Sequence, residues 1–226
     1  MSLTTEQITE IKQFINSRGF THIEVEMEIL DHVASATEDK LKQNPNLSLQ
    51  KAIQEIHASF GIFGFSTIEE EKQKHVSFLI RKQYWGDLKS FFTPERGAIN
   101  IMVILGLLIL TQLKNYISIE DMRHIPYIFA TALALTIGIR NYRRFSIWKN
   151  KSLMISLSVF PLYLIQPQFG NIIGLVTEDI ARSNPPLAGV FLISTVYLLI
   201  LMALACYYTM NWGYRWTYER YLKYTI

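Results

Sequence analysis

The sequence has one cysteine, Cys206, and lacks the motifs of the common enzyme classes. A single cysteine cannot form an internal disulfide, and no CxxC pair or cysteine–histidine spacing typical of a zinc site occurs. A P-loop, a GxSxG elbow, an HExxH helix and a glycine-rich dinucleotide turn are also missing. We therefore expect no catalytic residue, no metal site and no cofactor, and we interpret Cys206 as a small apolar residue that faces lipid or another helix.

Charge is scarce in the second part of the chain. Residues 1–96 carry 11 Lys and Arg against 14 Asp and Glu, whereas residues 97–226 carry 11 against 5. Four runs contain no ionisable side chain of the Asp, Glu, Lys, Arg or His type: Gly97–Leu113, Ile125–Ile139, Ser152–Thr177 and Asn184–Tyr214. Such side chains inside a membrane usually mark proton relays, ion pathways and intramembrane catalysis. Their absence argues against an ion-coupled transporter, and we expect that the protein is not an enzyme.

The N-terminus lacks the basic segment and apolar core of a secretory signal peptide, so we expect it to stay on the side of the membrane where it is made. The acidic balance of residues 1–96 excludes another class of partner. Nucleic-acid binding needs clustered positive charge, and we therefore expect no nucleic-acid partner.

The four uncharged runs predict four membrane spans, at about residues 97–113, 124–140, 152–168 and 186–208. A spanning helix needs about 20 mostly apolar residues, and about 17 are tolerated. The second run is short, and Arg140 and His124 are expected to extend it by reaching the two interfaces. Pro161 predicts a kink in the third span and Pro167 its end. Residues 171–177 then either lie along the outer surface or dip partly into the bilayer.

The cations between these runs predict the orientation of the membrane part. The central loop, residues 140–151, has five Lys and Arg and no acid, and residues 66–96 carry six Lys and Arg. The loops at residues 114–124 and 177–184 balance their basic residues with acids. Short loops rich in Lys and Arg stay in the cytoplasm. The sequence therefore predicts a multi-pass protein of the bacterial cytoplasmic (inner) membrane, with both termini in the cytoplasm.

Residues 1–65 predict a soluble head of three helices. Thr4 and Gln7 form a capping box before the first apolar stripe, a second helix is expected from about His22 to Lys42, and Ser48 caps a third. Three short helices in about 60 residues make a marginal core. We expect the head to gain stability from a partner, from a second copy of itself, or from the helix that follows.

The connector, residues 66–96, predicts one amphipathic helix. Ser66 and Glu69 form a capping box, and acids in the first turn precede a series of cations. Aromatic residues alternate with these cations, which suits a helix lying in the cytoplasmic interface against anionic lipid. The same pattern suits a fourth helix of the soluble head. Aromatic residues from Tyr207 to Tyr224 predict an interfacial C-terminal tail.

Two short runs in the head indicate a family. The run Glu28–Val33 places an Asp-His pair on the second helix, and Ser59–Gly61 ends the third. In these runs the head, about residues 4–65, resembles the HAAS-type three-helix domain, which lies at the cytoplasmic N-terminus of bacterial multi-helix membrane proteins. That family usually continues with a proline after Phe-Gly, whereas Ile62–Phe65 follows here. The family is linked with ABC-transporter permeases and PadR-type transcriptional regulators, so the resemblance implies a regulatory or accessory role and no reaction.

Five polar residues are candidates for binding a ligand or a partner: Glu28, Asp31, His32, Gln112 and Gln166. Neighbouring residues on a helix point about 100° apart, so Asp31 and His32 do not face each other. We interpret them as surface residues with local contacts rather than as a catalytic or metal-binding pair. Gln112 and Gln166 lie near the ends of predicted spans, where they either line a small pocket or face the interface.

These patterns predict an all-α fold, with a small N-terminal cytoplasmic bundle followed by a four-helix transmembrane bundle. Our leading hypothesis is an accessory or regulatory membrane protein whose head binds a protein partner and which is associated with a transporter or a regulator. The expected partners are membrane lipids and either that protein or a second copy of the chain. The alternative is an oligomeric transporter or lipid-handling protein. An enzyme ranks third, because it has only loop acids to use: Glu120, Asp121, Glu178 and Asp179.

Overall fold

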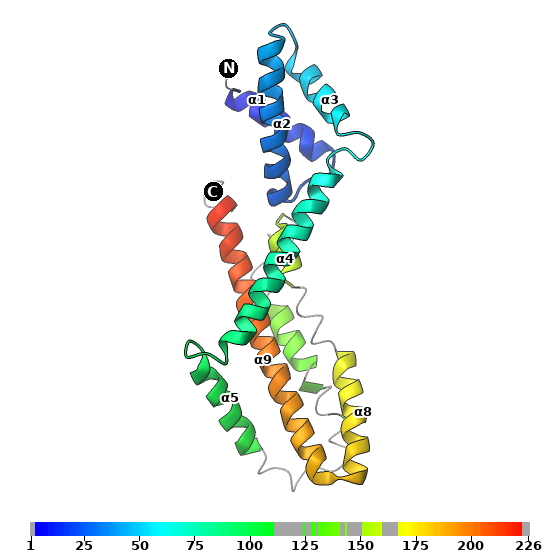
Figure 1. The fold of residues 1–226 in the computed structure, drawn as a ribbon, viewed down its shortest axis with the longest axis vertical. Coiled ribbons are helices and arrows are strands. Elements are labelled where there is room, and N and C mark those ends of the chain that lie inside the picture. The colour runs from blue at the N-terminus through cyan, green and yellow to red at the C-terminus, as the bar shows by residue number, and fades with distance from the viewer. Residues whose placement is uncertain are drawn as a thin grey trace. The chain divides into compact units, whose positions relative to one another are not determined.

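The computed structural model describes residues 3–110, 124, 128–129, 131–140, 143, 151–159 and 167–222, and every element in these ranges is a helix (Figure 1). The all-α prediction is thereby confirmed for the described residues. The chain divides into two compact units. Unit 1 comprises Met1–Leu79, Ile147–Leu157 and Trp216–Ile226, and unit 2 comprises Ile80–Ser146 and Ser158–Arg215.

Three helices form the N-terminal part of unit 1: α1 (Thr5–Ser17), α2 (Ile23–Gln43) and α3 (Leu49–Ser59). The predicted caps are present. The Thr4 hydroxyl accepts the amide of Gln7 at 3.3 Å while the Gln7 side chain accepts the amide of Thr4 at 2.9 Å, and the Ser48 hydroxyl accepts the amide of Lys51 at 3.3 Å. Each cap satisfies a backbone donor that the helix leaves unpaired, which is why these helices begin where the sequence predicts.

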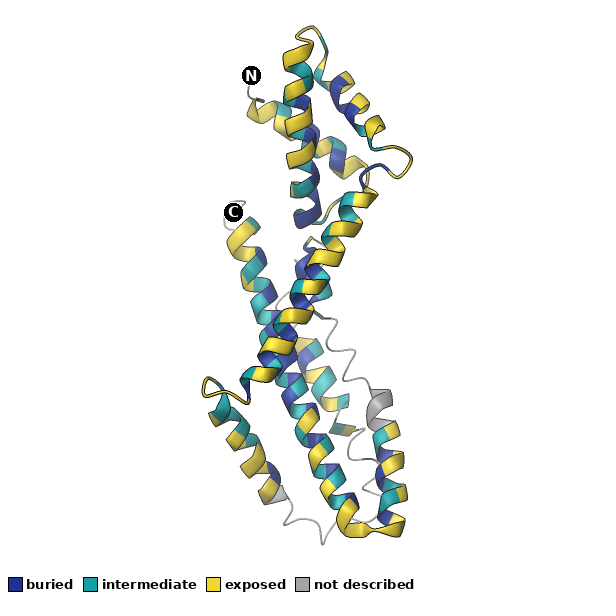
Figure 2. Ribbon diagram, viewed as in Figure 1, coloured by how far each residue is buried: buried dark blue, intermediate teal, exposed yellow. Residues whose placement is uncertain are grey.

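The core of unit 1 is an apolar interior centred on α2, which packs against both α1 and α3. Its buried side chains lie along one face of each helix, as Figure 2 shows for α2. They are Ile11, Ile15, Val25, Ile29, Val33, Ala52, Ile53 and Ile56. Burying one such Ile or Val contributes about 1.5–3 kcal/mol, so α2 is the helix on which the unit depends.

Helix α4 (Ser66–Ser90) is continuous over 25 residues and starts at Ser66, so that Ser66 lies in the first turn rather than at the predicted cap. Its residues up to Leu79 belong to unit 1 and those from Ile80 onward to unit 2. In unit 1, Val76 is fully buried and Lys72 pairs with Glu28 of α2. The first half of the connector therefore packs as a fourth helix of the head, as the alternative interpretation of the connector expects.

Unit 2 contains α5 (Gly97–Leu110), a helical stretch at residues 131–140, α8 (Pro167–Ser183) and most of α9 (Pro185–Thr217). Its buried core gathers around α9 and includes Leu199, Leu201, Cys206 and Met210. Cys206 is fully buried, in agreement with its interpretation as a packing residue.

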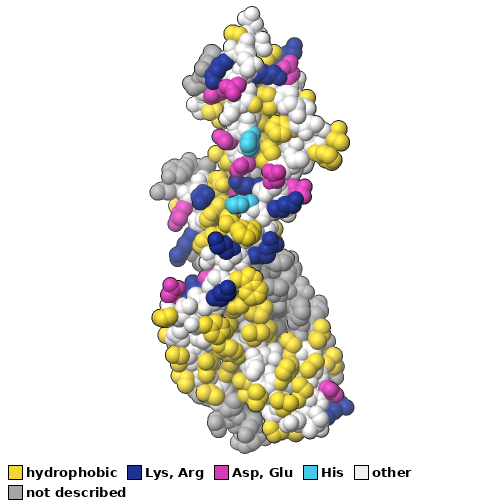
Figure 3. Space-filling view, viewed as in Figure 1, with side chains coloured by type: hydrophobic (Ala, Val, Ile, Leu, Met, Phe, Trp, Pro, Cys, Tyr) yellow, Lys and Arg dark blue, Asp and Glu magenta, His cyan; other side chains and the backbone are white. Residues whose placement is uncertain are grey.

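Within the described residues, one continuous helical stretch, Pro185–Tyr221, is long and apolar enough to cross a membrane. Two further apolar helices, at residues 97–108 and 131–140, are shorter. By length and composition, the long stretch is consistent with association of the chain with a membrane. On the face shown in Figure 3, hydrophobic side chains are numerous over the described helices of unit 2, which fits the same interpretation.

The third predicted span, residues 152–168, differs from the observed helices. Residues 153–157 form a five-residue helix, α7, that belongs to unit 1 and is followed by a turn at residues 158–159. Pro167 begins α8 rather than ending a helix, because proline lacks an amide hydrogen and fits the first turn. Residues 171–177 lie inside α8 as uninterrupted helix. The predicted kink at Pro161 lies outside the described residues.

The other predicted spans overlap observed helices over part of their length. The expected span at 97–113 coincides with α5 up to Leu110, and the one at 124–140 coincides with helix over residues 131–140. The fourth, 186–208, lies inside α9, which continues to Thr217 and then into a π-helical turn at Tyr218–Leu222. The described part of the aromatic tail therefore lies within α9 and the turn that follows it.

Candidate functional site

Two of the five predicted site residues share a pocket. Glu28 and His32 of α2 line a pocket of about 330 Å³ in unit 1 together with residues of α4. The α4 residues are Ile68, Glu71, Lys72 and His75. Asp31 is exposed and does not line this pocket, while Gln112 and Gln166 lie outside the described residues.

The pocket is a mixed-charge surface with one internal ion pair. Lys72 donates to a carboxylate oxygen of Glu28, and this hydrogen bond lowers the pKa of Glu28, with further lowering from the charges of Lys72, His32 and His75. Glu28 and His32 are spaced four residues apart on α2, as Glu71 and His75 are on α4. Within the described chain, no three His, Cys, Asp or Glu side chains are grouped so that they can hold a metal ion. The pocket therefore offers polar contacts to a partner.

A buried carboxylate that the sequence analysis missed joins three segments of unit 1. Glu24, in the first turn of α2, is fully buried. One of its oxygens accepts the Ser152 hydroxyl at 2.6 Å, the Met154 amide at 3.2 Å and the Thr217 hydroxyl at 3.4 Å. The other oxygen accepts the amide of Leu153 at 2.8 Å. All four donors are neutral groups, so hydrogen bonds alone offset the cost of burying this charge.

Further hydrogen bonds extend this junction. The Ser152 hydroxyl also lies 3.2 Å from the Thr217 hydroxyl and accepts the amide of Ile155, which caps α7. The backbone amide of Ile23 donates to the carbonyl of Lys151 at 2.8 Å. The start of α2, the segment containing α7 and the end of α9 therefore meet at one carboxylate, which we call the Glu24 junction (Glu24, Ser152, Leu153, Met154 and Thr217).

No sequence signal identifies the Glu24 junction. An acidic residue in the first turn of a helix is ordinary, because it interacts favourably with the helix dipole while remaining in water. The donors that bury Glu24 lie 128 to 193 residues further along the chain. Only the folded arrangement brings them together.

Unit 2 contains a second buried carboxylate, Asp87, near the end of α4. Asp87 is 3% exposed and accepts from the guanidinium of Arg96 at 2.8 Å. Its other oxygen accepts the Gln83 amide at 3.1 Å and the Thr209 hydroxyl of α9 at 3.0 Å. The Arg96 guanidinium also lies 3.9 Å from the ring centre of Tyr208, a cation–π contact. This cluster ties the turn between α4 and α5 to α9.

A sequence signal for Asp87 does exist. The buried residues Val76, Ile80 and Tyr84 recur every four positions along α4, and Asp87 follows three positions later on the same face. An acid that continues an apolar stripe is expected to be buried and paired.

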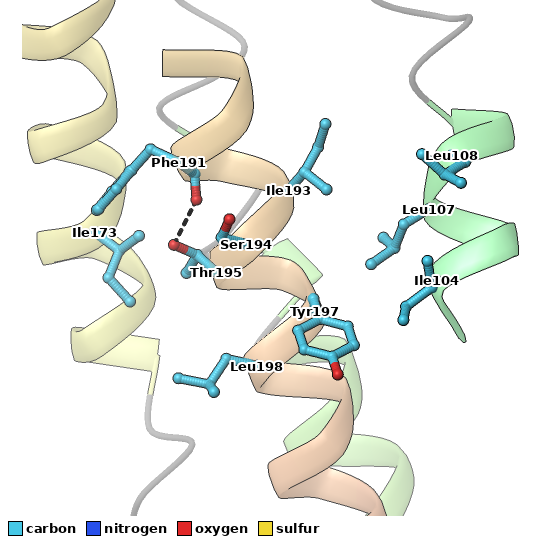
Figure 4. Close-up of a pocket in the computed structure, with 10 residues that line it drawn as sticks. All are labelled: Ile104, Leu107, Leu108, Ile173, Phe191, Ile193, Ser194, Thr195, Tyr197 and Leu198. Atoms are coloured by element: carbon cyan, nitrogen blue, oxygen red, sulfur yellow. Dashed lines mark hydrogen bonds between the residues drawn. The ribbon is translucent and has the colours of Figure 1, made fainter. Parts of the chain in front are cut away.

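Unit 2 also contains an apolar cavity of about 740 Å³ between α5, α8 and α9 (Figure 4). Aliphatic and aromatic side chains from the three helices line it, including Leu107, Ile173 and Phe191. The few polar groups of its wall are occupied. The Thr195 hydroxyl donates to the carbonyl of Phe191 at 2.8 Å, and the Tyr197 hydroxyl donates to Asn100 at 2.7 Å. The size and apolar wall of this cavity suit an apolar ligand.

Comparisons of the chain with protein-family models, with curated proteins and with solved structures found no match. The resemblance of the head to the HAAS-type domain therefore stays a prediction. The function of the chain is therefore inferred from the geometry within each of the two units.

Proposed function

We propose that the chain is a four-span protein of the bacterial cytoplasmic membrane that acts as an accessory or regulatory subunit, with a cytoplasmic head that binds a protein partner. The observation that carries the proposal is the Glu24 junction. Within unit 1, it joins the start of α2 to the segment containing α7 and to Thr217 at the end of α9 through buried hydrogen bonds.

The Glu24 junction supports an even number of crossings in each half of the membrane part. At about 1.5 Å per residue, the 33 residues of α9 span about 50 Å, more than the roughly 30 Å of a bilayer core. If α9 crosses, then Ser152 lies at the same inner end as Thr217, and the chain has to cross once more within residues 158–184. Residues 79 and 151 both belong to unit 1, so the crossings between them are also even in number.

Contacts inside unit 2 support the same count. Arg140, at the end of the helical stretch 131–140, donates to the Tyr207 hydroxyl at 3.0 Å, with its guanidinium 4.7 Å from the centre of that ring. Arg96, just before α5 begins, lies over Tyr208. The start of α5 and the end of the 131–140 helix therefore meet neighbouring residues of α9, as expected for one span that leaves the cytoplasmic interface and another that returns to it.

The apolar surface of unit 2 supports contact with lipid. Large hydrophobic side chains are exposed on three helices, and soluble monomers rarely expose so many. They include Ile101, Met102, Leu105 and Leu108 of α5, Ile172 and Leu175 of α8, and Leu187, Val190 and Leu198 of α9.

The regulatory part of the proposal rests on thermodynamic linkage. Suppose that a partner binds the head more tightly when the membrane helices have one arrangement than when they have another. Binding then shifts the equilibrium toward the first arrangement, by the difference between the two binding free energies. The lack of ionisable residues in the uncharged runs favours this role over ion-coupled transport.

Labelling of intact cells tests the topology. Cys206 is replaced by alanine, and single cysteines are placed at the exposed residues Asn46, Ser183 and Arg220. A membrane-impermeant maleimide is expected to label position 183 and to leave positions 46 and 220 unlabelled until the cells are opened. Labelling of only one of positions 46 and 220 in intact cells contradicts the four-span proposal.

Co-purification in mild detergent tests the accessory role. The full chain is expected to retain one defined protein, and Glu24→Ala, which weakens the packing of unit 1, is expected to retain less of it. Glu10→Ala, an exposed acid of α1, is the matched control. A chain that is always solitary and monodisperse, with no protein contacting its head, contradicts the proposal.

The apolar cavity of unit 2 favours a second candidate function, lipid handling in an oligomer. Native mass spectrometry of the detergent-purified chain is then expected to show a retained lipid. Leu107→Trp, which places an indole ring in the cavity wall, is expected to weaken retention of this lipid, whereas Leu187→Trp, at an exposed position of α9 outside the cavity, is expected to leave it bound. Equal retention by both variants contradicts lipid binding in the cavity.

A further inference from the structure

The turn between α3 and α4 presents two large apolar side chains to solvent. Ile62 is 95% exposed, more than any other large hydrophobic residue that the structure describes, and the adjacent Phe63 is 68% exposed. Figure 3 shows hydrophobic side chains protruding over this turn at the edge of the head. We call the segment Gly61–Gly64 the apolar turn.

The apolar turn is anchored on both sides. Gly61 and Gly64 have φ angles of +74° and +53°, in the left-handed region that favours glycine, and the Gly64 amide donates to the Gly61 carbonyl at 3.1 Å. The next residue, Phe65, is buried and makes edge-to-face contacts with His57 and Phe60 at ring-centre distances of 4.9 and 5.0 Å. The exposed pair therefore sits on a fixed support.

The folded chain makes no use of these two side chains for its own core. Ile62 and Phe63 protrude from the turn, while Phe65 fills the interior beside them. Isolated exposed apolar residues are ordinary, but two adjacent large ones on an anchored turn expose apolar area that a binding partner can bury. Few residues at the centre of an interface carry most of its binding energy, so two such side chains suffice as its anchor.

The charge around the apolar turn selects the class of partner. Residues 52–71, between Lys51 and Lys72, contain four acids and no Lys or Arg. Glu55 pairs with Lys40 and Glu70 with Lys74, while the remaining two acids make no ion pair within the part of the chain that the structure describes. Acidic groups are repelled by the anionic surface of the cytoplasmic leaflet. The same groups complement a protein surface that carries cations.

We propose that the apolar turn is the docking element of the head: Ile62 and Phe63 insert into an apolar groove of a cytoplasmic protein whose rim carries Lys and Arg. This inference rests on the proposed function, since it assigns the contact through which the head binds its protein partner. The partner is defined by this chemistry, an apolar groove with a cationic rim.

Site-specific photocrosslinking tests the inference in the full-length chain. A benzophenone amino acid replaces Phe63 in one variant and Asn46, an exposed residue of the α2–α3 loop, in another, and both are irradiated in the cells that naturally produce the chain. We expect a defined protein adduct at position 63 and none at position 46. The adduct is identified, and the purified protein is titrated against the full chain in detergent.

In that titration, Ile62→Ser and Phe63→Ser are each expected to weaken binding about tenfold or more. Met27→Ser, an exposed apolar residue of α2 in the same unit, is the control and is expected to bind as the unchanged chain does. The affinity is expected to fall as salt rises, because acids near the turn contact cations of the groove. Unchanged melting temperatures of the serine variants separate loss of binding from loss of folding.

The other results overturn the inference in distinguishable ways. A lipid adduct at position 63 assigns the apolar turn to the membrane. So does a blue shift of tryptophan fluorescence on adding phosphatidylethanolamine–phosphatidylglycerol vesicles that Ile62→Trp shows and the unchanged chain, with its four tryptophans, does not. An adduct with a second copy assigns it to self-association, and unchanged affinity of Phe63→Ser removes it from the interface. A protein adduct at position 46 without one at position 63 overturns the docking element and leaves the proposed function standing. No protein adduct at either position counts against both.

Discussion

Glu24 in unit 1 and Asp87 in unit 2 are both buried carboxylates, and the chain satisfies them in different ways. Asp87 is paired with a cation nine residues away, Arg96, with a side-chain amide one helical turn away, and with the hydroxyl of Thr209, 122 residues away. Glu24 has only neutral donors, all of them more than 120 residues distant. Asp87 thus combines a local ion pair with one long-range hydrogen bond to α9, whereas Glu24 depends entirely on neutral donors from distant segments.

The largest effect is expected from removing the Glu24 carboxylate. Glu24→Ala leaves two hydroxyls and two amides without their acceptor in a dry site, and we expect the free energy of unfolding to fall by about 3 kcal/mol. Glu24→Gln keeps one acceptor oxygen and is expected to cost about half as much. Urea unfolding of the full chain in detergent, followed by tryptophan fluorescence, measures both. An effect of Glu24→Ala no larger than that of the exposed control Glu10→Ala contradicts the comparison.

A somewhat smaller effect is expected at the Asp87 cluster. Arg96→Ala leaves Asp87 buried without its cation, and we expect a loss of about 2 kcal/mol, moderated because the Arg96 side chain is 25% exposed. In a double-mutant cycle with Asp87→Asn, the combined loss should be smaller than the sum of the two single losses. The matching cycle of Glu24→Gln with Ser152→Ala should show weaker coupling, because three other donors remain. Equal coupling energies in the two cycles contradict the proposed difference between Glu24 and Asp87.

A smaller effect on stability is expected from the half-exposed carboxylate of Glu28. Its pKa is lowered by the hydrogen bond from Lys72, so its stabilisation is present above the unfolded value of about 4.5 and is lost as pH falls through the folded value. Because solvent screens this pair, we expect less than about 1 kcal/mol. Lys72→Met should remove this part of the acid sensitivity, whereas Lys74→Met, whose ion-pair partner Glu70 is exposed, should change the acid profile less. Acid titrations that are identical for the two variants contradict this expectation.

The smallest effect concerns His57, whose titration has to be separated from that of the carboxylates. Burial lowers the pKa of His57, and the nearby Arg18 lowers it further. The unfolded chain then binds a proton more readily, so the stability contribution is complete above about pH 6.5 and declines as pH falls below that value. His57→Phe should flatten the stability profile just below pH 6.5 and leave the more acidic part unchanged. A profile that keeps its slope there shows that another group is responsible.

Local structure was predictable wherever neighbouring residues decide it. The Thr4–Gln7 capping box and the Ser48 cap determine where α1 and α3 begin, because each satisfies amides within its own first turn. Pro167 was predicted to end a helix and instead begins α8. Proline excludes the helix interior but is accepted in the first turn, so its presence alone does not tell which side of it is helical.

The candidate site was predictable only in part. Glu28 and His32 were singled out from the sequence, and the structure places both in one pocket with residues of α4. Ile62 and Phe63 were noted as a departure from the family pattern, but a run of apolar residues between helices does not tell which of them are buried. The anchoring of Phe65 in the core decides that its two neighbours point outward.

By itself, the sequence determined the helical class, the caps and the division between a charged N-terminal part and an apolar remainder, because periodicity, hydrogen bonds within one turn and composition are local properties. The tertiary structure decided which acids are buried and which apolar residues are exposed. A carboxylate such as Glu24 is stable in the interior only if donors from distant segments reach it, and no local pattern records where those segments meet.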